Sequence, residues 1–541
     1  MYPGHLCCSC YPRRNATTDL HANQHQSLPS IDSEILHIEG AIVHLVKRRA
    51  LLKRRRNTFA RVVNLPPEIL ALIFEYACIP SSKGDFASSS DMEERGTCTV
   101  GLTIGIGALT PLFLGSVCTA WRTVAFGASQ LWSTLKIYVG KKDTERQTNL
   151  LREWLARSVR RPLSIKVIEE DVAHCNDDDN DSSSSAWGID TTSVAIMDIL
   201  AAHSKQWYDM DLFLPCTWRK ALTRIRNDLP NLARLTLRGA HLNPSMARIS
   251  AFALAPMLLD VSIVDTYLLD DVELPWGQLR RLQADAFNHT DCLRAIQLCP
   301  ELRSCELERL CPSVVPPLDI SVHHTQLETL ILSTDVNTKI GAILGSLTLP
   351  ALKELVLSMP QDGCVLSGVL PLVRRSQCPL TRLQLVGPTP AENDLVKTLR
   401  GIPTLEHLLL LNPVVDSGGK LTNCLLNQMA NSGEAMEVDG ETHRQSTLLP
   451  KLKTFEYQGP VGFSSHELVR FLESRWFPGQ FVGDQAGDCM SPHLDSFLIT
   501  TTSDIVFQPA DSLILRRLRD EGMRLDFSVD CNVDNDSETE W

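Results

Sequence analysis

A pattern of apolar positions recurs through the C-terminal half of the chain. Ten phrases fit the form apolar-x-x-apolar-x-apolar, and their first positions are Leu232, Leu258, Leu279, Leu302, Leu327, Leu352, Leu380, Leu405, Leu452 and Leu494. Neighbouring first positions are 21 to 28 residues apart, except for the last two gaps of 47 and 42 residues. A unit near 25 residues is typical of a solenoid, in which each unit buries its apolar side only against its neighbours.

Each phrase predicts a short β-strand followed by a turn and a helix. The last two apolar positions alternate and so share one face of the strand, while the earlier leucine turns into the interior. Residues 390–400 predict a helix between two strands, with Leu395 and Leu399 on one side. Residues 464–476 predict another, because Ser464 and Glu467 form a capping-box pattern.

These elements predict a mixed α/β fold. We expect a leucine-rich-repeat-like β/α solenoid of horseshoe form over residues 150–528, because the period lies within the range of such repeats. Polar insertions near residues 172–190 and 413–448 interrupt the repeats and predict loops.

A second apolar pattern predicts a long helix over residues 31–60. Apolar residues recur at the coiled-coil spacing of three or four, with Arg49 interrupting the stripe, at Ile31, Ile35, Ile38, Ile42, Leu45 and Leu52. Residues 47–56 carry seven basic side chains. Two interpretations stay open: a solvated face that also suits the C-terminal end of the helix dipole, and a nuclear-localisation or nucleic-acid-binding patch.

Residues 62–78, VVNLPPEILALIFEYAC, predict a helix that begins at two prolines, which are tolerated in a first turn. Apolar residues surround most of this helix, so it should be buried on more than one side. A polar loop insert follows over residues 79–109. Residues 110–132 then predict two short helices and a closing pair, Leu131 and Trp132.

Together these segments resemble an F-box, the three-helix module that docks substrate receptors onto the Skp-type adaptor of SCF cullin-RING ubiquitin ligases. The resemblance covers residues 61–138, apart from the insert, and its matched positions are Leu65, Pro66, Pro67, Glu68, Ile69, Leu70, Ile73, Phe74, Val117, Cys118, Trp121, Arg122, Ala125, Leu131 and Trp132. A basic helix before the F-box and repeats after it are similar to the large F-box families of mushroom-forming fungi.

The resemblance implies a non-catalytic substrate-receptor subunit without a cofactor. It would bind the adaptor, and through it the cullin-RING ligase, with Leu65, Pro66, Pro67, Ile69, Leu70 and Ile73. It would form the module's core from Phe74, Val117, Cys118, Trp121, Arg122, Ala125, Leu131 and Trp132. The repeats would bind a protein substrate whose identity the sequence does not give. The alternative is a repeat scaffold outside any ligase, with residues 47–56 as a nuclear-localisation segment.

Composition narrows the class of protein. The net charge of −12 argues against a protein whose main role is to wrap nucleic acid, so no nucleic-acid partner is expected. Seventeen scattered cysteines, without a secretory leader, indicate an intracellular and thiol-reduced protein, cytoplasmic or nuclear. Residues 1–30 predict a disordered N-terminus, and residues 529–541 predict an acidic tail.

Sequence signals for other activities are weak. His5, Cys7, Cys8 and Cys10 cluster without a second pair at metal-finger spacing, and His323 and His324 predict a loop, so no metal site is expected. Residues 96–121 lack charge, but glycines, threonines and a proline dilute their hydropathy, so no membrane partner is expected. No nucleotide-binding, nucleophile-elbow or zinc-protease motif occurs, which argues against an enzyme.

Overall fold

The structure is a computed structural model. It describes residues 28–78, 110–139, 144–169, 194–214, 218–225, 228–239, 248–264, 269–311, 321–334, 340–359, 366–412, 419–430, 436–438, 441–443, 448–477, 493–501 and 505–529. These residues form two compact units. The first holds residues 28–78 and 110–131, and the second holds the described residues from Trp132 onward. The expected disordered start, apart from residues 28–30, the insert over 79–109, the insertion near 172–190 and all but the first residue of the acidic tail lie outside the described residues.

The first unit is helical. Its elements are α1 (Leu28–Asn57), the 3₁₀ turn η2 (Arg61–Asn64), α2 (Pro67–Cys78), α3 (Pro111–Val117), α4 (Thr119–Gly127) and most of the turn η4 (Ser129–Trp132). The long helix expected over residues 31–60 begins at Leu28 and ends at Asn57. No residue of α1 is buried, whereas α2, α3 and α4 pack on one another.

Side-chain caps explain why α3 and α4 are separate helices. The Thr110 hydroxyl accepts a hydrogen bond from the Phe113 N–H at 3.1 Å, and Cys118 Sγ accepts one from the Trp121 N–H at 3.5 Å. Cys118 itself has an extended backbone, which ends α3 and lets α4 begin in a new direction. The two helices approach closely because residue 115 is glycine: a Cβ there would lie 2.7 Å from the Phe126 ring.

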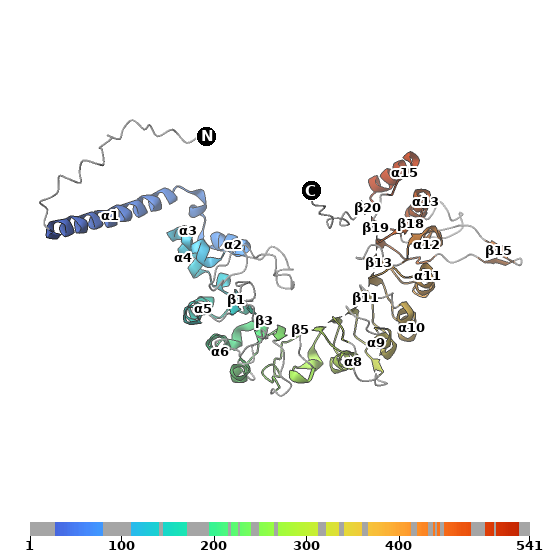
Figure 1. Cartoon of the computed structure of the whole chain (residues 1–541), viewed down its shortest axis with the longest axis horizontal. Helices are drawn as coiled ribbons and strands as arrows, with labels where there is room; N and C mark the ends of the chain where they lie inside the picture. Colours follow the sequence, from blue (N-terminus) through green and yellow to red (C-terminus); the bar gives the residue numbers. More distant parts are fainter. Residues whose placement is uncertain are drawn as a thin grey trace, which may run out of the picture. The chain divides into compact units, whose positions relative to one another are not determined.

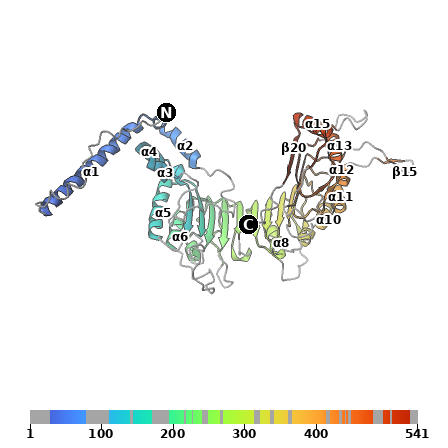
Figure 2. The same cartoon turned by 45° about the horizontal axis from the view of Figure 1, so that its top comes forward.

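The second unit contains a 14-stranded sheet in which each strand pairs in parallel with the next strand of that sheet along the chain. Figure 2 shows these strands side by side in a row. Its strands are β1 (Thr134–Val139), β2 (Leu163–Glu169), β3 (Trp207–Leu214), β4 (Arg234–Gly239), β5 (Asp260–Val264), β6 (Arg281–Asp285), β7 (Ser304–Glu308), β9 (Thr329–Ser333), β11 (Glu354–Ser358), β12 (Arg382–Val386), β13 (His407–Leu411), β17 (Thr454–Gln458), β19 (Ser496–Thr501) and β20 (Arg524–Val529).

The helices of the second unit lie along one side of the row of strands (Figure 1). They are α5 (Thr144–Ser158), α6 (Val194–Ala201), α7 (Arg219–Leu222), α8 (His289–Leu298), α9 (Ile340–Ser346), α10 (Leu366–Ser376), α11 (Glu392–Arg400), α12 (Asn423–Met429), α13 (Ser465–Trp476) and α15 (Pro509–Asp520). Parallel strands need crossover connections, and these helices provide them where the chain is described. The mixed α/β class and the solenoid-like order of elements are therefore confirmed.

All ten predicted phrases form strands of this sheet. Their ten first leucines, from Leu232 to Leu494, each have 0% exposure. Within a strand such as β11 the burial alternates, so Leu355 and Leu357 face the helices while their neighbours face the other side. The helices predicted at residues 390–400 and 464–476 are α11 and α13, and Ser464 accepts the capping hydrogen bond from the Glu467 N–H.

The sheet begins earlier than the predicted solenoid boundary at residue 150. Strand β1 pairs with β2 over its whole length, so residues 134–138 belong to the sheet rather than to the F-box segment. Trp132, expected in the F-box core, lies in the second unit with 0% exposure. Its carbonyl accepts a hydrogen bond from Trp154 Nε1 at 2.9 Å, and its ring meets that of Trp154 edge to face at 4.7 Å.

Short two-stranded pairs flank the main sheet. They are β8 (Val322–His323) with β10 (Leu347–Thr348), β14 (Leu421–Thr422) with β18 (Val461–Gly462), and the antiparallel hairpin of β15 (Met436–Val438) and β16 (Glu441–His443). The hairpin, β14 and α12 lie within the insertion predicted as a loop near residues 413–448, so part of that segment is regular structure.

Two arginines satisfy main-chain carbonyls at the ends of helices in neighbouring repeats. Arg375 of α10 donates from Nη2 to the Leu344 carbonyl at 2.6 Å, in α9. Arg475 of α13 donates to the Met429 carbonyl, at the end of α12, and to the Leu448 carbonyl, both at 2.6 Å. Burial lowers the pKa of Arg475 to about 10, so it stays charged near neutral pH. Each arginine thereby occupies carbonyls that a helix end leaves without an internal partner.

Candidate protein-interaction site

The two prolines position the start of α2. Pro67 is its first residue, and the Pro66 carbonyl accepts a hydrogen bond from the Leu70 N–H at 3.0 Å. Proline has no N–H to leave without a partner in this first turn. Pro66 and Pro67 are exposed, and Leu65 before them is half-buried.

One face of α2 belongs to the interior of the first unit. Leu70 is 2% exposed and Phe74 1% exposed, and Ala71 lies between them. The Phe74 ring meets the Trp121 ring of α4 edge to face, with 4.9 Å between centroids and 61° between planes. Such aromatic pairs stabilise a small core beyond their buried area.

The opposite face of α2 is apolar and exposed. Ile69 is 46% exposed, Leu72 58%, Ile73 45% and Tyr76 84%. These residues lie at i, i+3, i+4 and i+7, so they form one stripe along the helix. We call this set the α2 stripe. Large apolar side chains gathered on one exposed face are typical of a helix that binds a groove in a partner.

The structure changes the expected division between partner contacts and core. Leu70, expected at the adaptor contact, is buried because it lies on the Phe74 face of the helix. Val117, expected in the core, is 50% exposed at the end of α3. Ala125 and Leu131 are buried as core residues should be.

The other residues expected in the core have more specific positions. Trp121 is half-buried, Cys118 caps α4, and Arg122, though exposed, donates from Nε to the Gly115 carbonyl at 2.8 Å. That bond joins α4 to α3. Leu72 and Tyr76 are not among the predicted contacts. Their spacing of three and seven residues from Ile69 places all three on one helix face, and this spacing could have identified them from the sequence.

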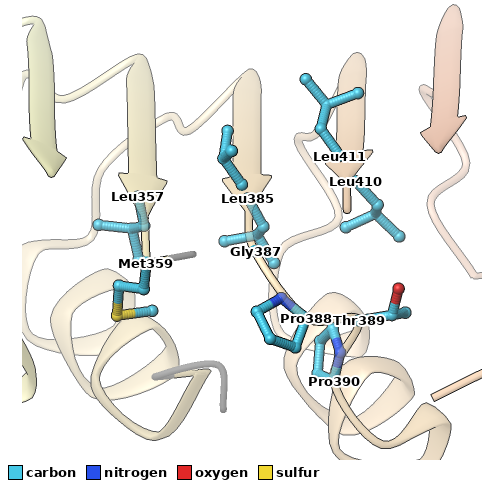
Figure 3. A pocket seen from close by; sticks show the side chains of 10 residues that line it. Leu357, Met359, Leu385, Gly387, Pro388, Thr389, Pro390, Leu410 and Leu411 are labelled. Carbon is cyan, nitrogen blue, oxygen red and sulfur yellow. The ribbon is translucent and has the colours of Figure 1, made fainter. Parts of the chain in front are cut away.

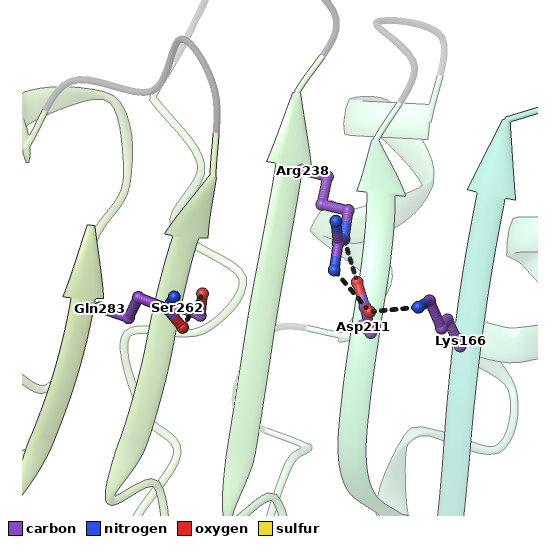
Figure 4. Close-up of polar contacts among 5 residues, drawn as sticks. All are labelled: Lys166, Asp211, Arg238, Ser262 and Gln283. Atoms are coloured by element: carbon purple, nitrogen blue, oxygen red, sulfur yellow. Dashed lines mark hydrogen bonds and ion pairs between the residues drawn. The ribbon is translucent and has the colours of Figure 1, made fainter. Parts of the chain in front are cut away.

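The sheet face away from the helices is polar over its first strands. Asp211 of β3 lies between two cations, as Figure 4 shows. Arg238 of β4 donates from Nε to Asp211 Oδ1 at 2.8 Å and from Nη2 to Oδ2 at 3.2 Å, and Lys166 Nζ of β2 lies 3.8 Å from Oδ2. Ser262 and Gln283 on β5 and β6 continue this face with a hydrogen bond of 3.2 Å.

A second row of charges runs across the same strands. Arg234 pairs with Asp209 at 2.7 Å, and Arg281 pairs with Asp260 at 3.2 Å. Burial raises the pKa of Asp209 even though the Arg234 bond opposes the shift. Each pair joins neighbouring strands, so the simplest role of these charges is to hold repeats in register.

The cavity between the ends of β11, β12 and β13 is too small for a ligand. Leu357, Met359, Leu385 and Gly387 line it together with Pro388 and Leu410 (Figure 3). Its volume is about 10 Å³, which is enough for about one water molecule. Its walls are mostly apolar, so it is a packing defect rather than a binding site.

The two adjacent histidines occupy structured positions, which corrects their prediction as a loop. His323 belongs to β8, and His324 is 4% exposed. His324 Nδ1 accepts hydrogen bonds from the N–H groups of Gln326 and Leu327, so Nε2 carries the proton and donates to the Cys299 carbonyl at 2.8 Å. The imidazole therefore fixes a turn between two repeats.

The described residues contain neither a metal-binding cluster nor a membrane-spanning helix. No group of three or more histidine, cysteine or acidic side chains there could hold a metal ion. No helix within the described ranges is long and apolar enough to cross a membrane, and the described part of segment 96–121 is divided between α3 and α4. The cluster of His5, Cys7, Cys8 and Cys10 lies outside those ranges.

Comparison with known proteins adds no relative: no protein-family model matches the chain, and no curated protein matches it.

Proposed function

We propose that the chain is a substrate-receptor subunit of an SCF-type cullin-RING ubiquitin ligase. Residues 61–131 would be the F-box, and the α2 stripe would bind a hydrophobic groove of a Skp-type adaptor. The repeats would be a leucine-rich-repeat horseshoe that holds a protein substrate. Catalysis would belong to other subunits, and this chain would contribute proximity between substrate and ubiquitin.

The observation that supports the proposal is that α2 is apolar on two sides and only one of them is buried. The prolines and Glu68 of the F-box-like sequence begin a helix whose inner side packs on Trp121. Its outer side presents four large apolar residues that nothing in the described part of the chain covers. Exposure of these apolar side chains to water is unfavourable, and binding in a hydrophobic groove of a partner would bury them.

Recovery of the adaptor with the tagged, full-length chain tests the proposal. Ile69→Glu together with Ile73→Glu places two charges in the stripe, and we expect adaptor binding to weaken by roughly tenfold or more. The milder pair Leu65→Ala and Ile69→Ala should weaken it less. Ile69 is 46% exposed, Ile73 is 45% exposed and Leu65 is half-buried, so none of these substitutions falls in the buried core and the variants should fold.

Leu513→Glu is the matched control, because Leu513 is an apolar residue of α15 with 67% exposure and lies in the other unit. It should leave adaptor recovery unchanged. Equal recovery with the double-glutamate variant and the parent would contradict the proposed contact. A parent chain that never recovers the adaptor, but stays in the nucleus through Lys53 to Arg56, would favour a repeat scaffold outside any ligase.

A further inference from the structure

Helix α1 carries a second exposed apolar stripe, separate from the α2 stripe. Leu28, Ile31, Ile35, Ile38, Ile42, Leu45 and Leu52 follow one another at coiled-coil spacing. Their exposures range from 40% for Ile31 to 77% for Leu28. A helix of 30 residues is about 45 Å long, and a helix with no buried residue gains little stability from packing.

Charge is divided along the length of α1 rather than around its girth. Asp32, Glu34 and Glu39 lie in the first half, whereas the seven basic residues from Lys47 to Arg56 lie in the second. An interfacial membrane helix is basic along its whole polar face, and the acidic half of α1 would be repelled by anionic lipid. A second, oppositely directed copy of α1 matches this division, because each acidic half then meets a basic half.

The heptad positions define this pairing. With Leu28 at position a, the apolar stripe occupies a and d, with Arg49 and Arg56 at the remaining a positions. Asp32 and Lys53 fall at position e, and Glu34 and Arg55 at position g. In an antiparallel pair that overlaps residues 30–57, Ile42 faces Leu45 of the other copy and Ile35 faces Leu52.

The same overlap places opposite charges beside the stripe. Asp32 faces Lys53 of the other copy, and Glu34 faces its Arg55, each pair occurring twice by symmetry. A parallel pair would instead bring Glu34 next to Glu39 and Arg48 next to Lys53, which are like charges.

We propose that α1 is a self-association helix, through which two copies of this chain form an antiparallel dimer. The inference does not depend on adaptor binding, because it uses residues before the F-box-like segment. The isologous contact closes on itself, so it yields a dimer and not a fibre.

Sedimentation velocity of the full-length chain over a range of concentrations tests the dimer. Ile42→Glu buries a charge at the centre of the stripe and should raise the dimer dissociation constant by roughly tenfold or more. Val43→Glu is the matched control: Val43 is the next residue, is 52% exposed against 53% for Ile42, and points away from the proposed contact at position b. It should sediment as the parent does.

Three results would overturn the dimer: a parent that is monomeric at all concentrations, equal loss of association in both variants, or equal retention in both. A monomeric parent that co-sediments with phosphatidylserine-containing vesicles would show that α1 binds a membrane surface instead.

Charge reversal tests the antiparallel direction. Glu34→Arg should weaken the dimer by roughly threefold or more, since the new side chain faces Arg55 of the other copy. Arg55→Glu should weaken it similarly, and the double variant should restore it. A parallel dimer predicts the opposite for Glu34→Arg, because that side chain would then face Glu39, so a tighter dimer in this variant would overturn the proposed direction.

Discussion

At the scale of single residues, the charge on Asp211 should matter for stability. Asp211 and Lys166 are both buried, and Asp211 is the anion between Lys166 and Arg238. Asp211→Asn keeps the shape of the side chain but removes the negative charge between two cations, of which Lys166 is buried. We expect the free energy of unfolding in urea at pH 7 to fall by about 3 kcal/mol.

Lys166→Met is the matched control for Asp211→Asn. It removes the more distant cation, at 3.8 Å, and leaves the two Arg238–Asp211 hydrogen bonds in place. Removing a desolvated charge offsets the lost attraction, so the cost should be about 1 kcal/mol or less. Equal costs for the two variants would contradict the view that the Asp211 charge holds β2, β3 and β4 together.

The residues of the α2 stripe show what the sequence could and could not predict at this scale. Apolar residues surround most of this helix, so the sequence already predicts that two of its sides are buried. The structure buries one of them, where Phe74 contacts Trp121. Which side each residue occupies depends on the direction in which α4 approaches. The sequence does not specify that direction, so it does not show that Leu70 lies on the buried side of α2. Val117, expected in the core, is exposed because it is the last residue of α3.

At the scale of elements, Gly387 is a position that only glycine suits. It follows β12 with φ of +137°, and a Cβ there would lie 2.2 Å from the Met359 carbonyl oxygen after β11. Gly387→Ala must therefore shift main chain between two repeats. We expect it to lower the free energy of unfolding by about 3 kcal/mol or more, measured by urea denaturation.

Gly522→Ala separates the two causes of that cost. Gly522 also has positive φ, +112°, but a Cβ there meets no atom within 4 Å. Only backbone strain remains, so its cost should be about 1–2 kcal/mol. If Gly387→Ala cost no more than Gly522→Ala, the close approach to Met359 would not contribute.

The strand prediction succeeded where a leucine marks the strand entry and failed elsewhere. In each predicted strand, a buried leucine lies three positions before the first buried residue of the strand. In β4, for example, Leu232 lies three positions before Leu235. In β1 and β3 the same place is taken by Trp132 and Trp207, both with 0% exposure. A rule restricted to leucine misses them, although the packing position is the same.

The two other missed strands of the 14-stranded sheet have no large apolar side chain three positions before the buried residues Ile165 of β2 and Leu525 of β20. Pro162 precedes β2 and Gly522 precedes β20, and both are exposed. Their strand residues still align with the buried column, since Ile165 pairs with Leu135 and Leu525 pairs with Phe497. These strands therefore form because they pair with a neighbouring strand. The local sequence does not indicate that pairing, because the partner strand is distant along the chain.

At the scale of the whole molecule, ion pairs between successive repeats should make the array sensitive to acid. A hydrogen bond from Lys353 lowers the pKa of Glu328, and one from Lys453 lowers that of Glu406, each at 2.7 Å. A carboxylate with a lowered folded-state pKa contributes stability above its unfolded value of 4.5 and loses it as pH falls through the folded value.

The double variant Glu328→Gln, Glu406→Gln should therefore lose less stability than the parent between about pH 5 and pH 3 in urea titrations. The Lys353–Glu328 pair is solvent-exposed and the Lys453–Glu406 pair is only part-buried, so the difference should be modest and should shrink in about 1 M NaCl. Comparing variant with parent cancels carboxylates such as Asp209, whose pKa moves the other way. Parallel pH profiles for the two proteins would contradict the prediction.

A stack of repeats should also lose its structure locally, because each repeat contacts mainly its neighbours. Cys305 of β7 reports on this: it is 0% exposed, pairs in register with Leu330 of β9, and burial raises the pKa of its thiol well above the usual value. A buried thiol reacts only when the structure around it opens. Leu330→Ala, beside it, should therefore accelerate labelling of Cys305 by a thiol reagent under native conditions.

Leu525→Ala in β20, at the far edge of the same sheet, is the matched control. Leu525 occupies the same column as Leu330 and is 8% exposed. Its loss should loosen the last strands and leave Cys305 labelling at the parent rate, as followed by mass spectrometry of the Cys305 peptide, with exposed Cys424 as the internal standard. Equal acceleration by both variants would show that the sheet opens as one cooperative body, because a nearest-neighbour stack transmits a defect only over adjacent repeats.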